Sequence, residues 1–187
     1  MVSEIRLPII GVVGTSSEEH QERATGLGSW LAGQGVHLLT GAGQGVMAAV
    51  SRAFAHVPER RGLVLGIVPC IAEDSPEVPK RGYPNAWIEV PIRTHLHLSG
   101  QEGEHPRSRN HLIALTATVL VALPGGAGTA SEVRLALRYK KPLIAYLKSR
   151  DEIPGLPAEV RSESDFNQVK AFIAQELARF QSENKRG

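Results

Sequence analysis

The residues with the clearest chemical potential lie in one stretch, residues 112–139. Apolar and β-branched residues at 118–123 predict a buried strand, and a turn rich in glycine follows at 124–129. From Ala130 the apolar residues return at helical spacing. A strand that turns through glycines into a helix presents backbone N–H groups and the positive end of the helix dipole, which together favour an anion. The stretch therefore predicts a cradle for a phosphate or a similar group.

Two charged residues are the candidates for chemistry beside this cradle. We expect Glu132 in the first turn of the helix, where its carboxylate either complements the helix dipole or faces the sugar of a bound nucleotide. Arg109 and Asn110 lie near the start of a helix expected over 107–116, and this end should approach the same crevice. An arginine there can bind a phosphate with two hydrogen bonds or hold a leaving group.

Two further turns follow predicted strands. Strand 7–14 ends in small polar residues, and strand 36–40 is followed by the G-x-G-x-G run at 41–45. This run lacks a third glycine at the dinucleotide spacing, so a nicotinamide fingerprint is not predicted. The carboxyl ends of parallel strands share one edge, where the crevice forms. The candidate ligand-binding residues are Gly14, Thr15, Ser16, Gly41, Gly43, Gly45, Asn110, Pro124, Gly125, Gly126, Gly128 and Thr129, and the candidate catalytic residues are Arg109 and Glu132.

The elements that must position these residues alternate along the chain. Further strands are expected at 63–69, 87–92 and 143–147, and helices at about 18–32 (with Ser17 as N-cap), 46–56, 130–139 and 166–180. Residues 70–86 have the composition of a mobile loop, residues 150–165 are irregular, and the tail from Ser182 is expected to fray. The pattern predicts a single α/β domain over 1–187, with its core at about 5–180. Its fold is Rossmann-like and doubly wound, a mostly parallel sheet flanked by helices on both faces.

Composition limits the function classes. The 187 residues carry a formal net charge of +2, which is too small to argue for nucleic acid or membrane binding. Cys70 is the single cysteine, and the start of the chain lacks a long apolar run, so we expect a cytoplasmic protein. His95 and His97 share one face of a strand, but no compact Cys/His set accompanies them, and no metal site is predicted. Serine-hydrolase and P-loop motifs are absent from the sequence.

The stretch 124–132 fits the P-G-G-x-G-T-x-x-E signature of the Lonely Guy family, whose members are often called lysine decarboxylases. The turn at 41–47 resembles the second glycine loop of that family, and 14–17 resembles its first. Arg109 falls where the family has the arginine of an arginine–lysine pair. The similarity covers about residues 7–147.

Other residues resemble the molybdenum cofactor carrier proteins, sister members with the same Rossmann-like fold. Asn110 stands where the Lonely Guy family has its lysine. The segment 107–123 and the Lys-Lys-Pro run at 140–142 look more like the carriers, which bind a pterin phosphate without an established hydrolysis.

The resemblance implies two alternative functions. The first is a nucleoside 5′-monophosphate phosphoribohydrolase that needs no cofactor and releases a free base and ribose 5-phosphate. Glu132 would then stabilise charge at the ribose C1′ or orient water, and Arg109 would anchor the nucleotide. The second is a non-catalytic carrier that retains molybdopterin in the same crevice, with segments 70–86 and 95–106 against the heterocycle. A DNA-binding role, as in other members of the wider fold group, is disfavoured by the small net charge.

The resemblance also implies a homodimer built partly from the helices that flank the central strand. Apolar positions on helix 130–139 that we expect to be exposed support it independently. Whether segments 70–86 and 95–106 close over the ligand is left open by the sequence.

Overall fold

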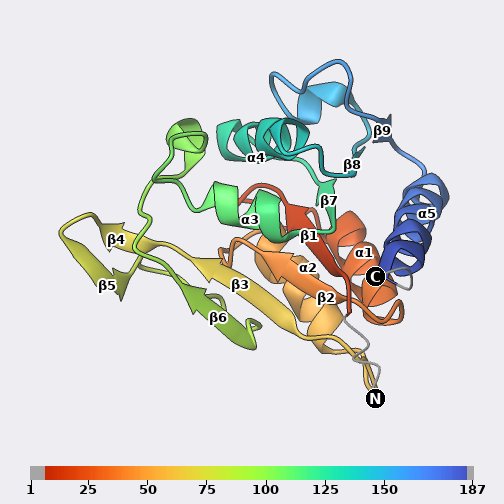
Figure 1. Cartoon of the computed structure of the whole chain (residues 1–187), viewed down its shortest axis with the longest axis horizontal. Helices are drawn as coiled ribbons and strands as arrows, with labels where there is room; N and C mark the ends of the chain where they lie inside the picture. Colours follow the sequence, from red (N-terminus) through yellow and green to blue (C-terminus); the bar gives the residue numbers. More distant parts are fainter. Residues whose placement is uncertain (1–6, 185–187) are drawn as a thin grey trace.

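The computed structural model describes residues 7–184 and contains a seven-stranded sheet in which every neighbouring pair is parallel. Across the sheet the strands are β6 (Val90–Arg93), β3 (Val64–Val68), β2 (His37–Thr40), β1 (Ile9–Val13), β7 (Val119–Ala122), β8 (Leu143–Tyr146) and β9 (Ser162–Glu163) (Figure 1). The chain runs outward from β1 to one side through β2 and β3, and returns to the other side at β7. Such a reversal leaves a crevice at the carboxyl ends of the two central strands.

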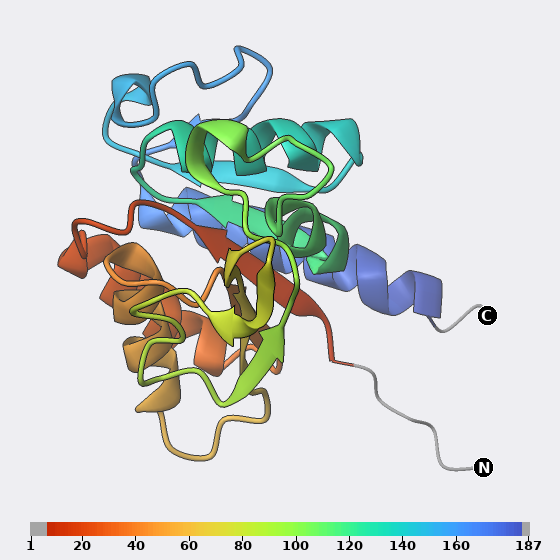
Figure 2. The same ribbon diagram turned by 90° about the vertical axis from the view of Figure 1, so that its left-hand side faces the viewer.

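Helices cover both faces of this sheet, which confirms the predicted Rossmann-like α/β fold. The helices α1 (Gln21–Ala32), α2 (Val46–Ala55) and α5 (Phe166–Asn184) pack on one face. The helices α3 (Asn110–Thr116) and α4 (Ala127–Arg138) pack on the other, as Figure 2 shows. The buried residues of β1 alternate between the two clusters, with Ile10 and Val12 in one and Val13 in the other. A strand buried on both faces explains the continuous apolar run in the sequence.

Several predicted boundaries are wrong, each for a local reason. Ser17 does not cap α1, which begins at Gln21 after His20. The hydroxyl of Thr15 instead accepts a hydrogen bond from the Ser17 backbone N–H (3.2 Å). The hydroxyl groups of Thr15 and Ser17 are also hydrogen-bonded to each other (2.8 Å), so the chain turns before the helix. The helix α4 begins at Ala127 rather than Ala130, so Glu132 lies beyond its first turn.

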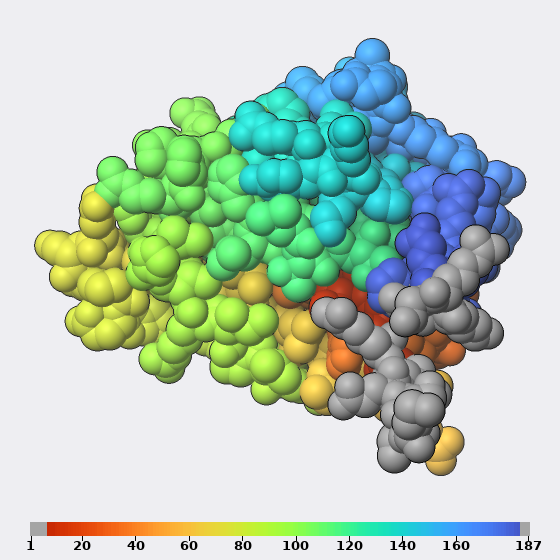
Figure 3. All heavy atoms as spheres, in the orientation of Figure 1, coloured from red at the N-terminus to blue at the C-terminus, as the bar shows by residue number. Residues whose placement is uncertain are grey.

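Segments predicted to be irregular contain short elements. Residues 70–86 include an antiparallel hairpin of β4 (Cys70–Ala72) and β5 (Ser75–Pro79), which forms one end of the molecule (Figure 3, yellow). Between 150 and 165, β9 adds a seventh strand by backbone pairing with β8, which side-chain periodicity does not reveal. The 3-10 helices η1 (Gly100–Glu102) and η2 (Arg150–Glu152) lie in loops.

The ends of other elements shift by a few residues. The helix α3 begins at Asn110 rather than near Arg107, and β6 spans Val90–Arg93 rather than 87–92. The last helix continues to Asn184, so Ser182 is helical rather than frayed. Residues 1–6 and 185–187 lie outside the described residues. The expectation of no leader and part of the predicted tail fall on them.

The apolar residues of α4 are less exposed than the sequence suggested. Ala130, Val133, Leu135 and Ala136 are buried within the monomer. The independent support for a homodimer from this helix is therefore lost, and the dimer stays a prediction. None of the helices within residues 7–184 combines the length and apolar composition that a membrane crossing needs.

Candidate functional site

A cavity of about 300 Å3 lies at the carboxyl edge of the sheet, near the ends of β1 and β7. Its volume is at the lower end of the range for small-molecule sites, about 300–1,000 Å3. Nine of the predicted residues line it: Gly14, Thr15, Ser16, Arg109, Asn110, Gly126, Gly128, Thr129 and Glu132. The parallel topology therefore brings together turns that lie more than a hundred residues apart in the chain.

The turn before α4 forms one wall of this cavity. Gly126 occupies the N-cap position of the twelve-residue helix, and the first N–H groups of a helix have no partner within it. A Cβ on Gly126 would meet no protein atom within 4 Å, so the room above this residue is open. Gly125 differs, because a Cβ there would collide with the Thr129 side chain and the Thr15 backbone. The backbone N–H of Thr15 donates to the Pro124 carbonyl (2.9 Å), which fixes the two turns together.

The second glycine turn supports the cavity from behind, and Gly41, Gly43 and Gly45 do not line it. A Cβ on Gly41 would strike the guanidinium of Arg109, and one on Gly45 would strike the Thr15 carbonyl. Gly45 also has a φ of 62°, which side chains rarely adopt. Pro124 and Gly125 likewise lie outside the lining and connect β7 to α4. These glycines are needed because other parts of the site pack against them.

Arg109 is buried at the base of the cavity, with 4% of its surface exposed. Its Nη1 donates to the carbonyls of Gly41 and Ile67 (2.7 Å for the latter), so the guanidinium holds the ends of β2 and β3. Its Nε is buried and has no hydrogen-bond partner among residues 7–184. Burial lowers the pKa of Arg109, while Tyr83 and Glu132 act in the opposite direction. A buried guanidinium that lines a cavity favours an anionic ligand through its charge.

Glu132 is 7% exposed and projects into the same cavity. Burial raises the pKa of its carboxyl to about 7, and the positive charge of Arg109 only partly opposes this effect. The carboxyl therefore keeps its proton to a higher pH than an ordinary glutamate does. Because the dipole effect is confined to the first turn of a helix, complementing the dipole of α4 does not account for this residue.

Asn110 joins α3 to α4 at the edge of the cavity. Its Nδ2 donates to the Ser131 hydroxyl (3.0 Å), which in turn donates to the Gly128 carbonyl (2.7 Å). A lysine at this position could not replace this buried neutral link without bringing a charge into the contact. Asn110 therefore positions the cradle as well as lining the cavity.

Five lining residues were not predicted individually: Met47, Lys80, Tyr83, Ser99 and Gly100. Lys80 and Tyr83 come from segment 70–86, and Ser99 and Gly100 come from segment 95–106. The expectation that these segments border the ligand named no residue, because nothing in their composition shows which side chains turn inward. With Lys80 and Arg109, the lining carries more positive than negative charge, which favours an anion.

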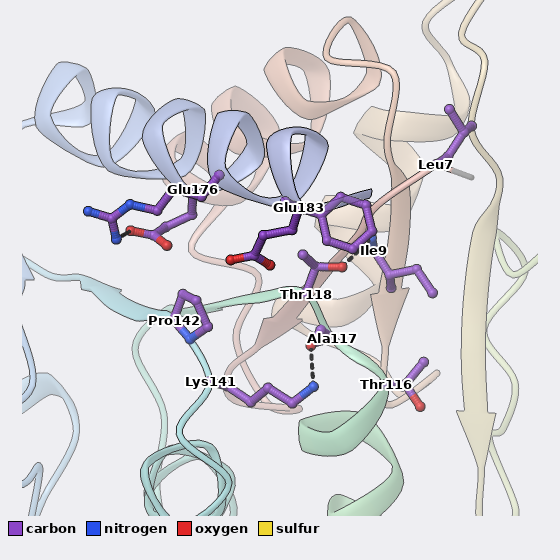
Figure 4. Close-up of a pocket in the computed structure, with 11 residues that line it drawn as sticks. Leu7, Ile9, Thr116, Ala117, Thr118, Lys141, Pro142, Glu176 and Glu183 are labelled. Atoms are coloured by element: carbon purple, nitrogen blue, oxygen red, sulfur yellow. Dashed lines mark hydrogen bonds and ion pairs between the residues drawn. The ribbon is translucent and has the colours of Figure 1, made fainter. Parts of the chain in front are cut away.

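A larger cavity of about 530 Å3 lies at the opposite, amino-terminal edge of the sheet (Figure 4). Several of its polar side chains, including Lys141 and Thr118, are bonded to nearby protein atoms. Lys141 donates to the carbonyls of Leu115 (2.6 Å) and Ala117 (3.0 Å), and the hydroxyl of Thr118 accepts from the backbone N–H of Ile9 (3.1 Å). Glycine turns are absent from its lining. This arrangement indicates a structural gap rather than a ligand site.

His95 and His97 are the histidines that invite a metal interpretation. No group of three His, Cys, Asp or Glu side chains able to hold a metal ion occurs in residues 7–184. His111 bonds the hydroxyl of Tyr139 through Nδ1 (2.5 Å) and the carbonyl of His105 through Nε2 (3.1 Å). It connects the loop before α3 to the end of α4.

The sequence profile of the SLOG cluster4 family matches residues 7–177. The chain belongs to this family. That assignment agrees with the resemblance to the Lonely Guy and molybdenum cofactor carrier superfamily, because both glycine turns and the crevice lie within the matched residues.

The chain is also similar to several known proteins. The molybdenum cofactor carrier protein of Chlamydomonas reinhardtii is 30% identical, with a TM-score of 0.69 over 93% of this chain and 99% of that one. The molybdenum cofactor binding protein of the phototrophic bacterium Rippkaea orientalis is 28% identical, with a TM-score of 0.66 over 90% and 99% of the two chains. An uncharacterized protein of Archaeoglobus fulgidus is 29% identical over 154 residues, 81% of this chain and 87% of that one.

Proposed function

We propose that this SLOG cluster4 chain binds a phosphorylated heterocycle in the crevice, and that the heterocycle is the molybdenum cofactor. The observation that carries this proposal is the similarity, at 28–30% identity over nine-tenths of the chain, to two proteins named for that cofactor. The chain would then act as a carrier, which the sequence offered as the alternative to a hydrolase.

The residues of the crevice fit the phosphate end of such a ligand. The turn before α4 offers unpaired N–H groups and open room above Gly126. Thr15, Ser16 and Thr129 add hydroxyl groups at the same wall. The buried guanidinium of Arg109 lines the crevice and brings a positive charge to it, which favours an anionic ligand.

The state of Glu132 also suits retention of an anion. An ordinary glutamate would be fully charged at neutral pH and would repel a phosphate held nearby. The raised pKa of about 7 makes the protonated form of Glu132 accessible near neutral pH, and that form repels an anion less and can donate a hydrogen bond. When bound, the cofactor would supply molybdenum chemistry to the enzyme that receives it. The residues of this chain would bind it, orient it and limit its contact with water.

A second candidate function is hydrolysis of a nucleoside 5′-monophosphate, and a specific observation favours it. Glu132 is buried beside Arg109 within the intact signature 124–132, and such a carboxylate can stabilise positive charge that develops at the ribose C1′. Removal of one preorganised group of this kind typically costs about 10²–10³ in rate. Glu132→Gln therefore separates the two functions, because it keeps the shape of the side chain and removes its charge.

The experiment has two measurements. Mass spectrometry of the supernatant of denatured protein identifies what co-purifies, and chromatography detects free base released from AMP, GMP and related monophosphates. The carrier proposal expects a pterin-type ligand and no release of base. Release of base by the wild type that is lost in Glu132→Gln would overturn it in favour of the hydrolase. A protein that retains no pterin and releases no base contradicts both functions.

A further inference from the structure

Residues 80–85, between β5 and β6, form a wall of the crevice that no glycine motif includes. Lys80 and Tyr83 from this segment line the cavity with the α4 turn and Arg109. Tyr83 is half-buried and lines the cavity. It is the single aromatic residue of the lining.

The position of this wall is set by hydrogen bonds to the second glycine turn. The backbone N–H of Asn85 donates to the Ala42 carbonyl (2.8 Å), and its Nδ2 donates to the Gly43 carbonyl (2.8 Å). The Nε2 of Gln44 donates in return to the Gly82 carbonyl (3.1 Å). Asn85 is itself buried. These three bonds attach the segment that carries Tyr83 to the same turn that packs against Arg109.

The ring of Tyr83 is fixed further by two close neighbours. The central carbon of the Arg109 guanidinium lies 5.4 Å from the ring centroid, a cation–π contact. A Cβ on Gly43 would lie 2.7 Å from Cε of Met47 and 3.0 Å from the Tyr83 hydroxyl, so glycine there leaves room for both side chains. Since Arg109 is held by the carbonyls of Gly41 and Ile67, the ring rests on a group that cannot easily move.

We infer that Tyr83 is the residue against which the planar ring of the ligand packs. The inference rests on the proposed function, which supplies the class of ligand, a phosphate joined to a heterocycle. A preorganised aromatic side chain binds such a ring at small cost in conformational entropy. The phosphate end is held elsewhere, at the α4 turn, so Tyr83 should select for the ring and be indifferent to the phosphate.

The test compares ligands with and without a ring. Binding of neopterin monophosphate, GMP and ribose 5-phosphate is measured by calorimetry for the wild type, Tyr83→Leu and Tyr83→Phe. Tyr83→Leu should weaken binding of the ring-bearing ligand by about tenfold, the effect typical of losing one aromatic stacking contact. Its affinity for ribose 5-phosphate should not change. Tyr83→Phe keeps the ring and should retain both affinities.

Two results would overturn the inference: equal losses for the ligands with and without a ring, or no loss for either. Gly43→Ala provides a second variant, since its methyl group crowds Tyr83 and Met47, which both line the cavity, and should weaken ring binding while phosphate binding persists. Wild-type protein that binds GMP but not neopterin monophosphate contradicts the cofactor proposal and leaves the Tyr83 test valid. Wild-type protein that binds none of the three ligands contradicts both the cofactor proposal and the inference about Tyr83.

Discussion

The two edges of the sheet each have a cavity, and the smaller one has the properties of a ligand site. The cavity at the amino-terminal edge has a volume of about 530 Å3, and the side chains of Lys141 and Thr118 in it already form hydrogen bonds with neighbouring backbone groups. The carboxyl-terminal edge has about 300 Å3, and it contains a buried arginine N–H without a partner and a buried carboxyl with a raised pKa.

The difference between the two edges shows that polarity is more informative than volume. A buried polar group without a partner costs about 1–3 kcal/mol, and at a cavity a ligand can offset that cost. Arg109 carries such a cost at one edge, and burial there raises the pKa of Glu132. Lys141 and Thr118 at the other edge form ordinary hydrogen bonds that hold the fold. Three predictions test this contrast.

The largest expected effect concerns the buried carboxyl of Glu132. Its pKa in the folded state, about 7, is above the value near 4.3 in the unfolded chain. The folded state therefore binds this proton more tightly, and its stability falls as pH rises through 7. Glutamine does not ionise, so the free energy of unfolding of Glu132→Gln relative to the wild type should rise by about 3 kcal/mol between pH 4 and pH 8.5. Urea unfolding of both proteins across this pH range measures the difference in stability. A difference that does not change with pH contradicts the raised pKa of Glu132.

The next effect concerns the cradle at Gly126. A Cβ at Gly126 meets no protein atom within 4 Å, so Gly126→Val extends methyl groups from open room where an anion is expected. Loss of two hydrogen bonds from backbone N–H groups to a charged ligand should weaken binding of ribose 5-phosphate by about a hundredfold, or about 2.7 kcal/mol. Thr116→Val, at the amino-terminal cavity, is the matched control and should bind like the wild type. Unchanged affinity in Gly126→Val would place the phosphate elsewhere.

The smallest effect sharpens the contrast from the amino-terminal edge. Lys141→Met removes two hydrogen bonds to the carbonyls at the end of α3, so thermal unfolding should show a loss of stability of about 1 kcal/mol. Affinity for ribose 5-phosphate should not change, because no contact with the crevice is removed. A loss of affinity in this variant would show that the two edges are not independent.

Much of the fold and part of the site could be predicted from short-range patterns. The apolar runs at 7–14 and 118–123 predicted buried parallel strands, and the glycine turns after them predicted an anion cradle. Convergence of these turns follows from the topology alone, because parallel strands end at one edge. Boundaries were less accurate, as at Ser17 and Ala130, since local side-chain bonds and helix starts compete within a few residues.

The sequence by itself determined the residue types that the crevice needs, and only the tertiary structure decided how they act. Arg109 reads as a phosphate ligand, but its Nη1 is bonded to the Gly41 carbonyl, 68 residues away. Nothing in the sequence distinguishes the pKa of Glu132 from that of any glutamate, and burial in the folded chain raises it to about 7. Tyr83 belongs to no motif. It reaches the site because hydrogen bonds join its segment, residues 80–85, to the distant glycine turn at 41–45. Periodicity and glycine spacing depend on near neighbours, whereas burial and long-range hydrogen bonds depend on which distant segments the sheet brings together.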